Sequence, residues 1–288
     1  FRSTDSGVNG TAFNSGLSAT WVRRLFVNGT TTFAGTFGGG AFRSTDQGEN
    51  WMSVNQGLTN LDVRSFAAIG TAIFAATGSG GVYRSTNNGD TWTGINAGLT
   101  SRFTNALAAS GTTLYAGISG GVFRSINNGD LWTRVSNGLP NGDISTLTAS
   151  GSTLFVGFEG DGVFRSLNSG DNWAPANVGL TNKSVNDIAR LGGLLFTATS
   201  SGIFRSNDNG NNWVLVRSGL FNALVTNGTD IFAGHGGSGV FRSANNGDNW
   251  VSFGFGLTNR VVEAVAASGN RILAGTPGGG VFFVDIAN

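Results

Sequence analysis

Carboxylate side chains are the groups of this chain best suited to acid–base or metal chemistry, and half of the 16 belong to one repeated motif. The motif reads Ser-x-(Asp/Asn)-x-Gly-x-x-Trp, as between Ser44 and Trp51. The eight acids in its copies are Asp5, Asp46, Glu49, Asp90, Asp130, Asp171, Asp208 and Asp248. Four copies replace the Asp by Asn87, Asn127, Asn168 and Asn245. Both residues accept hydrogen bonds but only Asp carries charge, so the exchange indicates a structural turn.

The other eight acids are the candidates for catalysis: Asp62, Asp143, Glu159, Asp161, Asp187, Asp230, Glu263 and Asp285. Glycoside hydrolysis uses two carboxylates about 5–10 Å apart across a cleft. Glu159 and Asp161 are the only close pair, but both lie in one short loop and cannot flank a sugar rigidly. A third acid, such as Asp143 or Asp187, would have to join them, and nothing in the sequence selects between the two.

Metal and cofactor chemistry have little support in the sequence. The chain has no cysteine and a single histidine, His235, in the stretch Gly234–Gly239. One histidine without a second His or Cys is a poor metal ligand set, and without a placed partner it is a poor catalytic base. We therefore predict no metal, no cofactor and an exposed loop position for His235, although a shortened connection at Gly219–Leu224 would lower the surface beside it.

The motif recurs at a nearly constant period. An aromatic residue and an arginine precede each copy, and the arginines are Arg2, Arg43, Arg84, Arg124, Arg165, Arg205 and Arg242. Their steps are 41, 41, 40, 41, 40 and 37 residues, by subtraction of these numbers. A period near forty indicates a repeat fold. The turn residues Asp46, Asn87, Asn127, Asn168, Asp208 and Asn245, with Trp51, Trp92, Trp132, Trp173, Trp213 and Trp250, are predicted to be structural, as are the seven arginines.

Each repeat reads as four short strands. In one unit we expect strands at Val63–Ile69, Ala72–Thr77, Val82–Ser85 and Thr91–Asn96, separated by glycine-containing turns. Asp or Asn in the motif accepts backbone N–H groups, glycine supplies a positive φ, and Trp packs back as an apolar plug. Seven such meanders predict an all-β, seven-bladed β-propeller of four-stranded antiparallel blades, forming one domain over residues 1–288.

The strand count is odd at the ends of the chain. Seven blades need 28 strands, whereas the pattern offers 29, because Phe1–Ser3 and Val281–Val284 both resemble third strands. We expect a "Velcro" blade whose first two strands come from the C-terminal region and whose outer strand is 11–14. One third-strand segment is then surplus. It would either fray or pair with another molecule, so residues 1–4 or 281–288 are candidate self-association segments.

A propeller places the motif turn on one rim and the loops around the central channel on the other, where ligands usually bind. We align the repeats on the Leu of their Gly-Leu pair. The position six residues after this Leu is occupied by Arg23, Arg64, Asn105, Ser145, Asn186 and Glu263 in successive repeats that keep the spacing. The position four residues after the same Leu is occupied by Trp21, Asp62, Phe103, Asp143, Ser184 and Val261. The ligand candidates at the channel mouth are thus Trp21, Arg23, Asp62, Arg64, Asn105, Asp143, Asn186 and Glu263, with His235 beside them. The alternative is a polar, water-filled channel without a ligand.

The chain resembles the Asp-box (BNR) repeat β-propeller family, which includes sialidases, xyloglucanase-type glycosidases, sortilin-type receptors and photosystem II assembly-factor-like proteins. Six of the seven motif copies match fully when Asn is allowed for Asp, and in the first Gly10 stands where Trp is expected. The resemblance covers essentially the whole chain. It implies a propeller and says little about function, because one fold hosts many activities.

The catalytic members of that family fit poorly. A sialidase needs a Tyr nucleophile, but Tyr83 and Tyr115 occupy positions filled by Phe in other repeats and are expected in the core. A xyloglucanase-type enzyme would pair two propellers around two catalytic Asp residues, and this chain has one ring. An assembly-factor-like binder presents a basic patch, of which Arg23, Arg24 and Arg64 would form only a small version.

Composition points to a binding or structural module. The net charge is +1 with 17 basic and 16 acidic residues, which gives no broad footprint for nucleic acid. No apolar run is long enough to span a membrane. We predict a non-catalytic, extracellular or cell-surface interaction protein that binds a protein partner, a glycan or further copies of itself. The alternative is a carbohydrate-active enzyme that uses carboxylates at the channel mouth.

Overall fold

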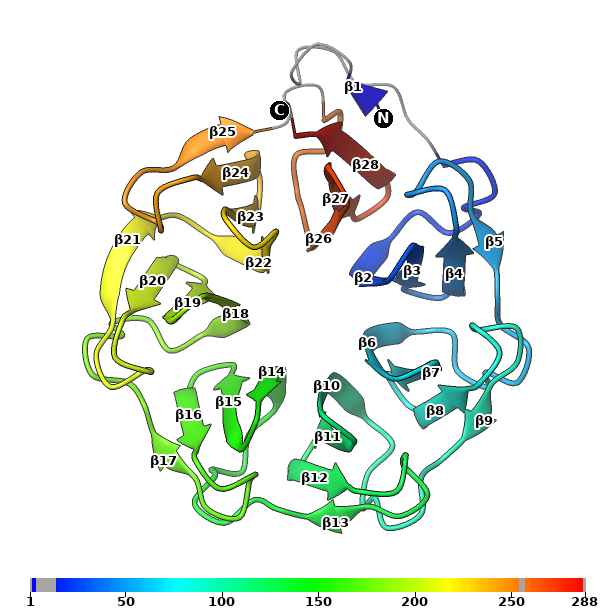
Figure 1. Cartoon of the computed structure of the whole chain (residues 1–288), viewed down its shortest axis with the longest axis horizontal. Coiled ribbons are helices and arrows are strands. Elements are labelled where there is room, and N and C mark those ends of the chain that lie inside the picture. The colour runs from blue at the N-terminus through cyan, green and yellow to red at the C-terminus, as the bar shows by residue number, and fades with distance from the viewer. Residues whose placement is uncertain (1, 4–13, 254–256, 287–288) are drawn as a thin grey trace.

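The computed structural model describes residues 2–3, 14–253 and 257–286. These residues form 28 strands in seven four-stranded sheets, arranged as blades around a central axis (Figure 1). The predicted all-β, seven-bladed propeller is confirmed. No helix with the length and apolarity needed to cross a membrane occurs in the described residues.

The strands follow one order in blades 1 to 6, from the axis outward. The innermost strands of blades 1 to 7 are β2 (Val22–Asn28), β6 (Val63–Ile69), β10 (Thr104–Ser110), β14 (Ile144–Ser150), β18 (Val185–Leu191), β22 (Phe221–Thr226) and β26 (Ala264–Ser268). The second strands are β3 (Thr31–Thr36), β7 (Ala72–Thr77), β11 (Thr113–Ile118), β15 (Thr153–Phe158), β19 (Leu194–Thr199), β23 (Ile231–His235) and β27 (Arg271–Thr276). The third strands are β4 (Gly40–Ser44), β8 (Gly81–Ser85), β12 (Gly121–Ser125), β16 (Gly162–Ser166), β20 (Gly202–Ser206), β24 (Gly239–Ser243) and β28 (Gly280–Asp285). The outer strands are β5 (Met52–Ser53), β9 (Thr93–Gly94), β13 (Thr133–Arg134), β17 (Ala174–Pro175), β21 (Val214–Ser218), β25 (Val251–Phe253) and, in blade 7, β1 (Arg2–Ser3).

The core lies between neighbouring blades. The second strand of each blade is apolar and buried along nearly its whole length, because sheets cover both of its faces. Tyr83 and Tyr115 are 3% and 2% exposed, so the prediction that both belong to the core is confirmed.

The outer strand is shorter than predicted. The sequence predicts a strand over Thr91–Asn96, but the strand covers Thr93–Gly94, with one further backbone bond from Ile95 N to Val82 O at 2.9 Å. The side chain of Asn96 takes over where the strand stops: its Oδ1 accepts a 2.7 Å hydrogen bond from Val82 N, and its Nδ2 donates to Gly80 O at 3.3 Å. A side chain thus replaces backbone pairing at the edge of the blade.

Blade 7 contains strands from both ends of the chain. β28 pairs antiparallel with β27 in the third position, and β1 lies outside it in parallel, with Arg2 opposite Phe283. The prediction of a surplus segment is wrong for Arg2–Ser3, because parallel pairing with β28 gives it a place in the chain's own ring. The predicted outer strand 11–14 lies almost entirely outside the described residues. Its last residue, Asn14, accepts from Val281 N at 2.9 Å, as Asn96 does from Val82 N in blade 2.

The repeated turn, from Ser to Trp of each motif copy, is closed by side-chain hydrogen bonds. Ser85 Oγ donates to Asn87 Oδ1 at 2.8 Å and accepts from Gly89 N at 2.8 Å. Asn87 Oδ1 also accepts from Thr91 N at 3.0 Å. Asn88 and Gly89 have φ of 56° and 93°, so two successive residues are left-handed where the sequence predicted only the glycine. Among the described residues, six non-glycine residues adopt that conformation, and four of them are Asn, which tolerates it well.

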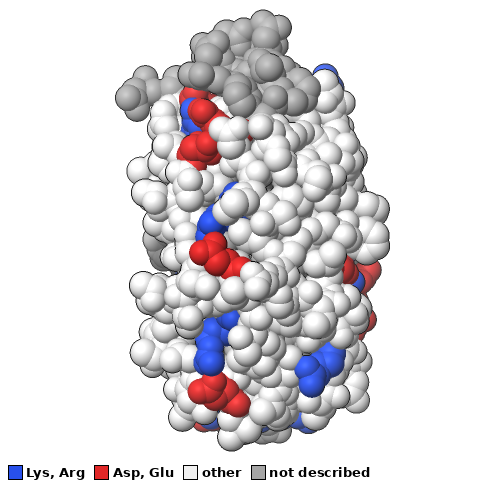
Figure 2. Space-filling model, turned by 90° about the vertical axis from the view of Figure 1, so that its right-hand side faces the viewer, with Lys and Arg blue, Asp and Glu red and all other residues white. Residues whose placement is uncertain are grey.

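The repeated turns link neighbouring blades, and at the boundary between blades 2 and 3 they do so in both directions. Arg84 Nη1 reaches forward to Asp130 Oδ1 of the next blade at 2.7 Å, and Trp132 Nε1 reaches back to Ile95 O at 2.7 Å. Matching forward pairs are Arg43–Asp90, Arg124–Asp171 and Arg205–Asp248. Figure 2 shows basic and acidic side chains alternating along this rim of the disc. These contacts agree with the predicted scaffold role for Arg43, Arg84, Arg124 and Arg205. Arg165 reaches Asn211 of the next blade, and Arg242 binds Asp230 within its own blade. The side chain of Arg2 lies outside the described residues.

We expect the turn of blade 5 to give stability that depends on pH. Hydrogen bonds from the side chain and backbone of Asn212, and from Ser206, lower the pKa of Asp208 from 3.8 to about 2. Because the folded pKa lies below the unfolded one, this stabilisation is present above pH 3.8 and is lost as pH falls through about 2. The difference in urea midpoint between the wild type and Asp208→Asn should shrink from pH 5 to pH 2. The reciprocal Asn87→Asp should introduce the same dependence in blade 2, and parallel midpoints over this range would contradict the assignment.

Candidate functional site

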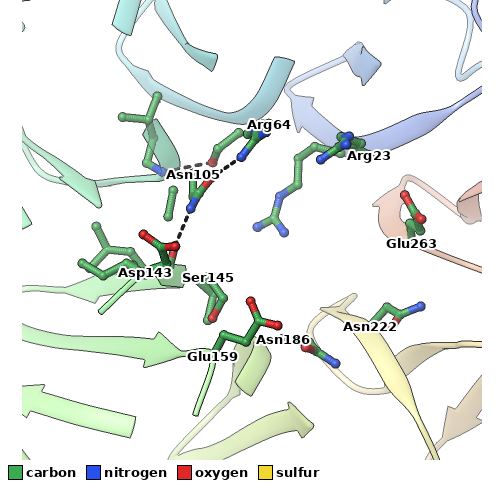
Figure 3. Close-up of a pocket in the computed structure, with 16 residues that line it drawn as sticks. Arg23, Arg64, Asn105, Asp143, Ser145, Glu159, Asn186, Asn222 and Glu263 are labelled. Atoms are coloured by element: carbon green, nitrogen blue, oxygen red, sulfur yellow. Dashed lines mark hydrogen bonds between the residues drawn. The ribbon is translucent and has the colours of Figure 1, made fainter. Parts of the chain in front are cut away.

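A cavity of about 370 Å³ opens at the channel mouth. Its wall is built from the first residues of the inner strands, where every blade contributes one side chain to a ring (Figure 3). The ring residues, in blade order, are Arg23, Arg64, Asn105, Ser145, Asn186, Asn222 and Glu263. The six predicted members lie together as expected. Asn222 was not predicted, because the connection before Phe221 is shortened. Asn222 therefore follows Leu220 by two residues, whereas the other ring residues follow their aligned Leu by six.

Four ring residues hold neighbouring blades together. Asn105 Nδ2 donates to Ile144 O at 3.0 Å, and Ser145 Oγ donates to Val185 O at 2.5 Å. Asn186 and Asn222 repeat the pattern towards Phe221 O and Val262 O, at 2.7 and 3.0 Å. In each case the side chain satisfies the carbonyl of the next inner strand. These polar residues are therefore explained by the ring itself.

The three charged ring residues depart from this pattern, and they occupy the adjoining blades 7, 1 and 2. Arg64 Nε and Nη2 contact Asp62 Oδ2 at 2.8 and 2.7 Å, and its Nη1 donates to Asn105 Oδ1 at 2.7 Å. Arg23 Nε lies 3.4 Å from Asp62 Oδ1 without a hydrogen bond. Glu263 Oε2 accepts from Trp21 Nε1 at 2.7 Å. The predicted residues Trp21 and Asp62 thus contact Glu263 and Arg64 and orient these charged members of the ring.

Exposed aromatic rings support the two arginines. The guanidinium carbon of Arg23 lies 4.6 Å from the centre of the Phe37 ring, and that of Arg64 lies 4.3 Å from the centre of Phe103. Trp21 packs against Phe37 with ring centres 5.2 Å apart. Cation–π contacts of this kind fix a guanidinium in place. Phe37 was not singled out from the sequence, because it lies in a loop outside both aligned positions.

Acidic residues of blade 4 face these arginines across the channel. Asp143 precedes β14, Glu159 follows β15, and both are exposed and line the cavity (Figure 3). Asp161 does not line it; its Oδ2 lies 3.0 Å from the position a Cβ would take on Gly142. Among the described residues, none of these three carboxylates takes part in an ion pair.

Asp187, the other acid considered as a partner for Glu159, has a structural role. It is 4% exposed, and its Oδ1 accepts from Thr146 Oγ1 and Ile188 N at 3.1 and 3.0 Å. Its Oδ2 accepts from Leu224 N of blade 6 at 2.9 Å. The carboxylate therefore replaces a backbone acceptor between two inner strands. Arg24 Nη1 approaches it at 3.8 Å from across the channel.

His235 does not belong to the cavity. The sequence predicted an exposed loop residue, but His235 ends β23 and is only partly exposed, which corrects that prediction. Its ring packs edge-on against Phe221, with centres 5.0 Å apart, because the shortened connection brings β22 close. Burial and the nearby charge of Arg217 lower the pKa of His235.

The arrangement fits polar recognition at a fixed pocket. Within the described ranges, no three His, Cys, Asp or Glu side chains gather closely enough to hold a metal ion.

Arg24, absent from the predicted set except as part of a small basic patch, also lines the cavity. Its signal was the Arg23-Arg24 pair, in which a β-bulge after Val22 turns both side chains toward the channel.

Solved structures share this fold at low sequence identity. The extracellular domain of BT4673 from B. thetaiotaomicron has a TM-score of 0.78 and 17% identity, over 96% of this chain and 39% of its own. The GH74 enzyme of Niastella koreensis has 0.77 and 16%, over 98% and 54%. YCF48 from Cyanidioschyzon merolae has 0.70 and 13%, over 91% and 94%. The chain thus spans less than half of the first protein, and these likenesses show the fold alone.

Sequence comparison adds one assignment. No curated protein matches the chain. The family model described as the DUF6242 beta propeller domain matches residues 11–157, which is just over half of the 288 residues. The chain therefore belongs to the DUF6242 beta propeller domain family.

Proposed function

We propose that this propeller is a non-catalytic binding module whose ligand enters the cavity at the channel mouth. The observation that carries the proposal is the break in the ring. Four ring residues satisfy backbone carbonyls, whereas Arg23, Arg64 and Glu263 are charged and occupy neighbouring blades. Charged residues cost more to hold in a channel than the Asn or Ser that suffices elsewhere, and ligand pockets carry a small number of placed polar or charged groups that orient the ligand.

The proposal also includes an Asp-box type of turn and a location outside the cell or at its surface. The hydrogen bonds around Ser85, Asn87 and Trp92 support an Asp-box turn. Likeness to the extracellular domain of BT4673 supports an extracellular or cell-surface location, and a protein or glycan partner would suit that setting.

The proposal includes self-association through the N-terminal end of the chain. β28 already pairs with β27 and β1 in its own blade, and Phe282 and Phe283 are 1% and 2% exposed. Removing 281–288 would therefore damage the core, so the informative truncation is loss of 1–4. Light scattering that shows an oligomer for the full chain and a monomer without 1–4 would support exchange, and equal masses would count against it.

A ligand screen tests the binding role. We expect a ligand found on arrays of peptides and glycans to bind Arg23→Gln at least ten-fold more weakly than the wild type. Asp130→Asn, on the opposite rim, should bind as the wild type does. Equal affinities for all three proteins would place the ligand elsewhere and overturn the proposal.

The second candidate is a carbohydrate-active enzyme that uses Asp143 with Glu159 or Asp161. The observation in its favour is that Asp143 and Glu159 both line the cavity. Glycosidase assays on oligosaccharides decide between the two roles. Turnover that Asp143→Asn abolishes would establish the enzyme and displace the binding role.

A further inference from the structure

The charges around the cavity are divided between its two sides. Three arginines line it from blades 1 and 2: Arg23, Arg24 and Arg64. Three carboxylates line it as well, of which Asp143 and Glu159 stand on the opposite side, in blade 4 (Figure 3). The lining is therefore neutral in total and strongly dipolar across the channel.

The basic side has hydrogen-bond donors to spare. Arg64 is held on three sides by Asp62 and Asn105, but no hydrogen bond from the guanidinium of Arg23 or Arg24 occurs among the described residues. Asp187 cannot neutralise Arg24 fully, because both of its oxygens already accept hydrogen bonds and the ion pair is 3.8 Å long. Phe37 holds the Arg23 guanidinium at 4.6 Å. Two guanidinium groups are thus ready to receive a carboxylate.

The acidic side lacks a cation. Asp143 and Glu159 have no basic partner within the described part of the chain, and Asp161 adds a third negative charge beside Gly142. Glu263 differs, because Trp21 already donates to it. An anion alone would be repelled by blade 4, and a cation alone by blades 1 and 2. A ligand with both charges satisfies both sides.

Size and the aromatic rings narrow the choice. About 370 Å³ is near the lower limit for ligand sites, roughly 300–1,000 Å³, and admits a molecule no larger than a short peptide. Sugars commonly stack on open aromatic faces, and the exposed Trp21 ring already has the Arg23 guanidinium 5.6 Å from its centre. The faces of Phe37 and Phe103 turned to Arg23 and Arg64 are already covered by guanidinium groups 4.6 and 4.3 Å away.

The geometry points to a zwitterionic ligand of dipeptide size, whose carboxylate binds Arg23 and Arg24 and whose ammonium binds Asp143 and Glu159. This inference rests on the proposed binding function and names its ligand class. Both charges are recognised without a covalent step. Side chains of the peptide would extend toward the open channel mouth.

Capping each end of one peptide tests the inference. Alanyl-alanine is titrated calorimetrically into the folded protein, beside its N-acetyl and C-terminal amide forms. We expect each cap to weaken binding at least ten-fold. In the double variant Asp143→Asn/Glu159→Gln, the N-acetyl cap should make no further difference, and in Arg23→Gln/Arg24→Gln the amide cap should make none. Asp90→Asn/Asp130→Asn, with two exposed acids changed on the other rim, is the matched control and should retain the full effect of both caps.

The outcomes separate this inference from the function beneath it. Equal binding of free and capped peptides overturns the zwitterion. Failure of every amino-acid or peptide probe, with a glycan bound in a manner that Arg23→Gln abolishes, overturns the ligand class and leaves the binding module standing. Failure of probes of all classes to respond to the cavity variants overturns both.

Discussion

Replacing Trp132 by alanine is expected to lower the free energy of unfolding by about 4 kcal/mol. The indole is 3% exposed and packs in the cluster between blades 2 and 3 that contains Ile95 and Leu114. The variant loses this contact area and leaves a cavity between two sheets. Urea unfolding monitored by circular dichroism measures the change.

Trp132→Phe separates the two contributions of the indole. Phenylalanine keeps most of the packing but cannot donate to Ile95 O, which leaves a buried carbonyl unpaired at a cost of about 1–3 kcal/mol. Trp250 provides the comparison, because its Nε1 donates to Gly247 O in its own turn and, among the described residues, not to the preceding blade. A loss of less than 1 kcal/mol in Trp132→Ala would show that the blades do not depend on this residue.

Gly57→Ala is the second change with a large expected effect. Gly57 has φ of 93°, and a Cβ there would lie 2.0 Å from Trp92 O, which belongs to the outer edge of blade 2. Trp92 N also donates to Gln56 O at 2.8 Å, so the two segments cannot separate without losing that bond. Backbone strain and overpacking together should cost about 3 kcal/mol or more.

Gly70→Ala is the matched control. Gly70 has φ of 58°, but nothing lies within 4 Å of its Cβ position. This variant bears the left-handed strain alone and should lose only about 1–2 kcal/mol. Chemical denaturation of both variants gives the difference, and equal losses would show that the approach of Trp92 O does not limit residue 57.

The blade pattern was readable because it is local. The predicted strands Val63–Ile69 and Ala72–Thr77 agree with β6 and β7 at both ends, since glycine turns and apolar runs mark them in the sequence. The outer strand was overestimated, because the Asn96 side chain competes with backbone pairing and such competition leaves no periodic signal. The parallel pairing of β1 joins Arg2 and Phe283, which are 281 positions apart, and the repeat pattern contains no signal for this pairing.

The candidate site was predicted in position more than in chemistry. Alignment of the repeats placed Arg23, Asn105 and Glu263 on one ring, because a repeat carries equivalent residues to equivalent places. It could not tell that Asn105 is engaged with Ile144 O while Arg23 keeps free donors, since those contacts depend on the neighbouring blade. His235 was misplaced for the same reason: the packing of Phe221 decides its burial.

The forward reach of Arg84 and the backward reach of Trp132 make each boundary between blades directional. Every such blade carries half of a clasp on one face and the complementary half on the other, which is the head-to-tail interface of a cyclic oligomer. The loops that connect the blades then serve to keep the blades close together, and the contacts of the clasp set the angle between one blade and the next. A chain of a single repeat would present both halves of the clasp without partners.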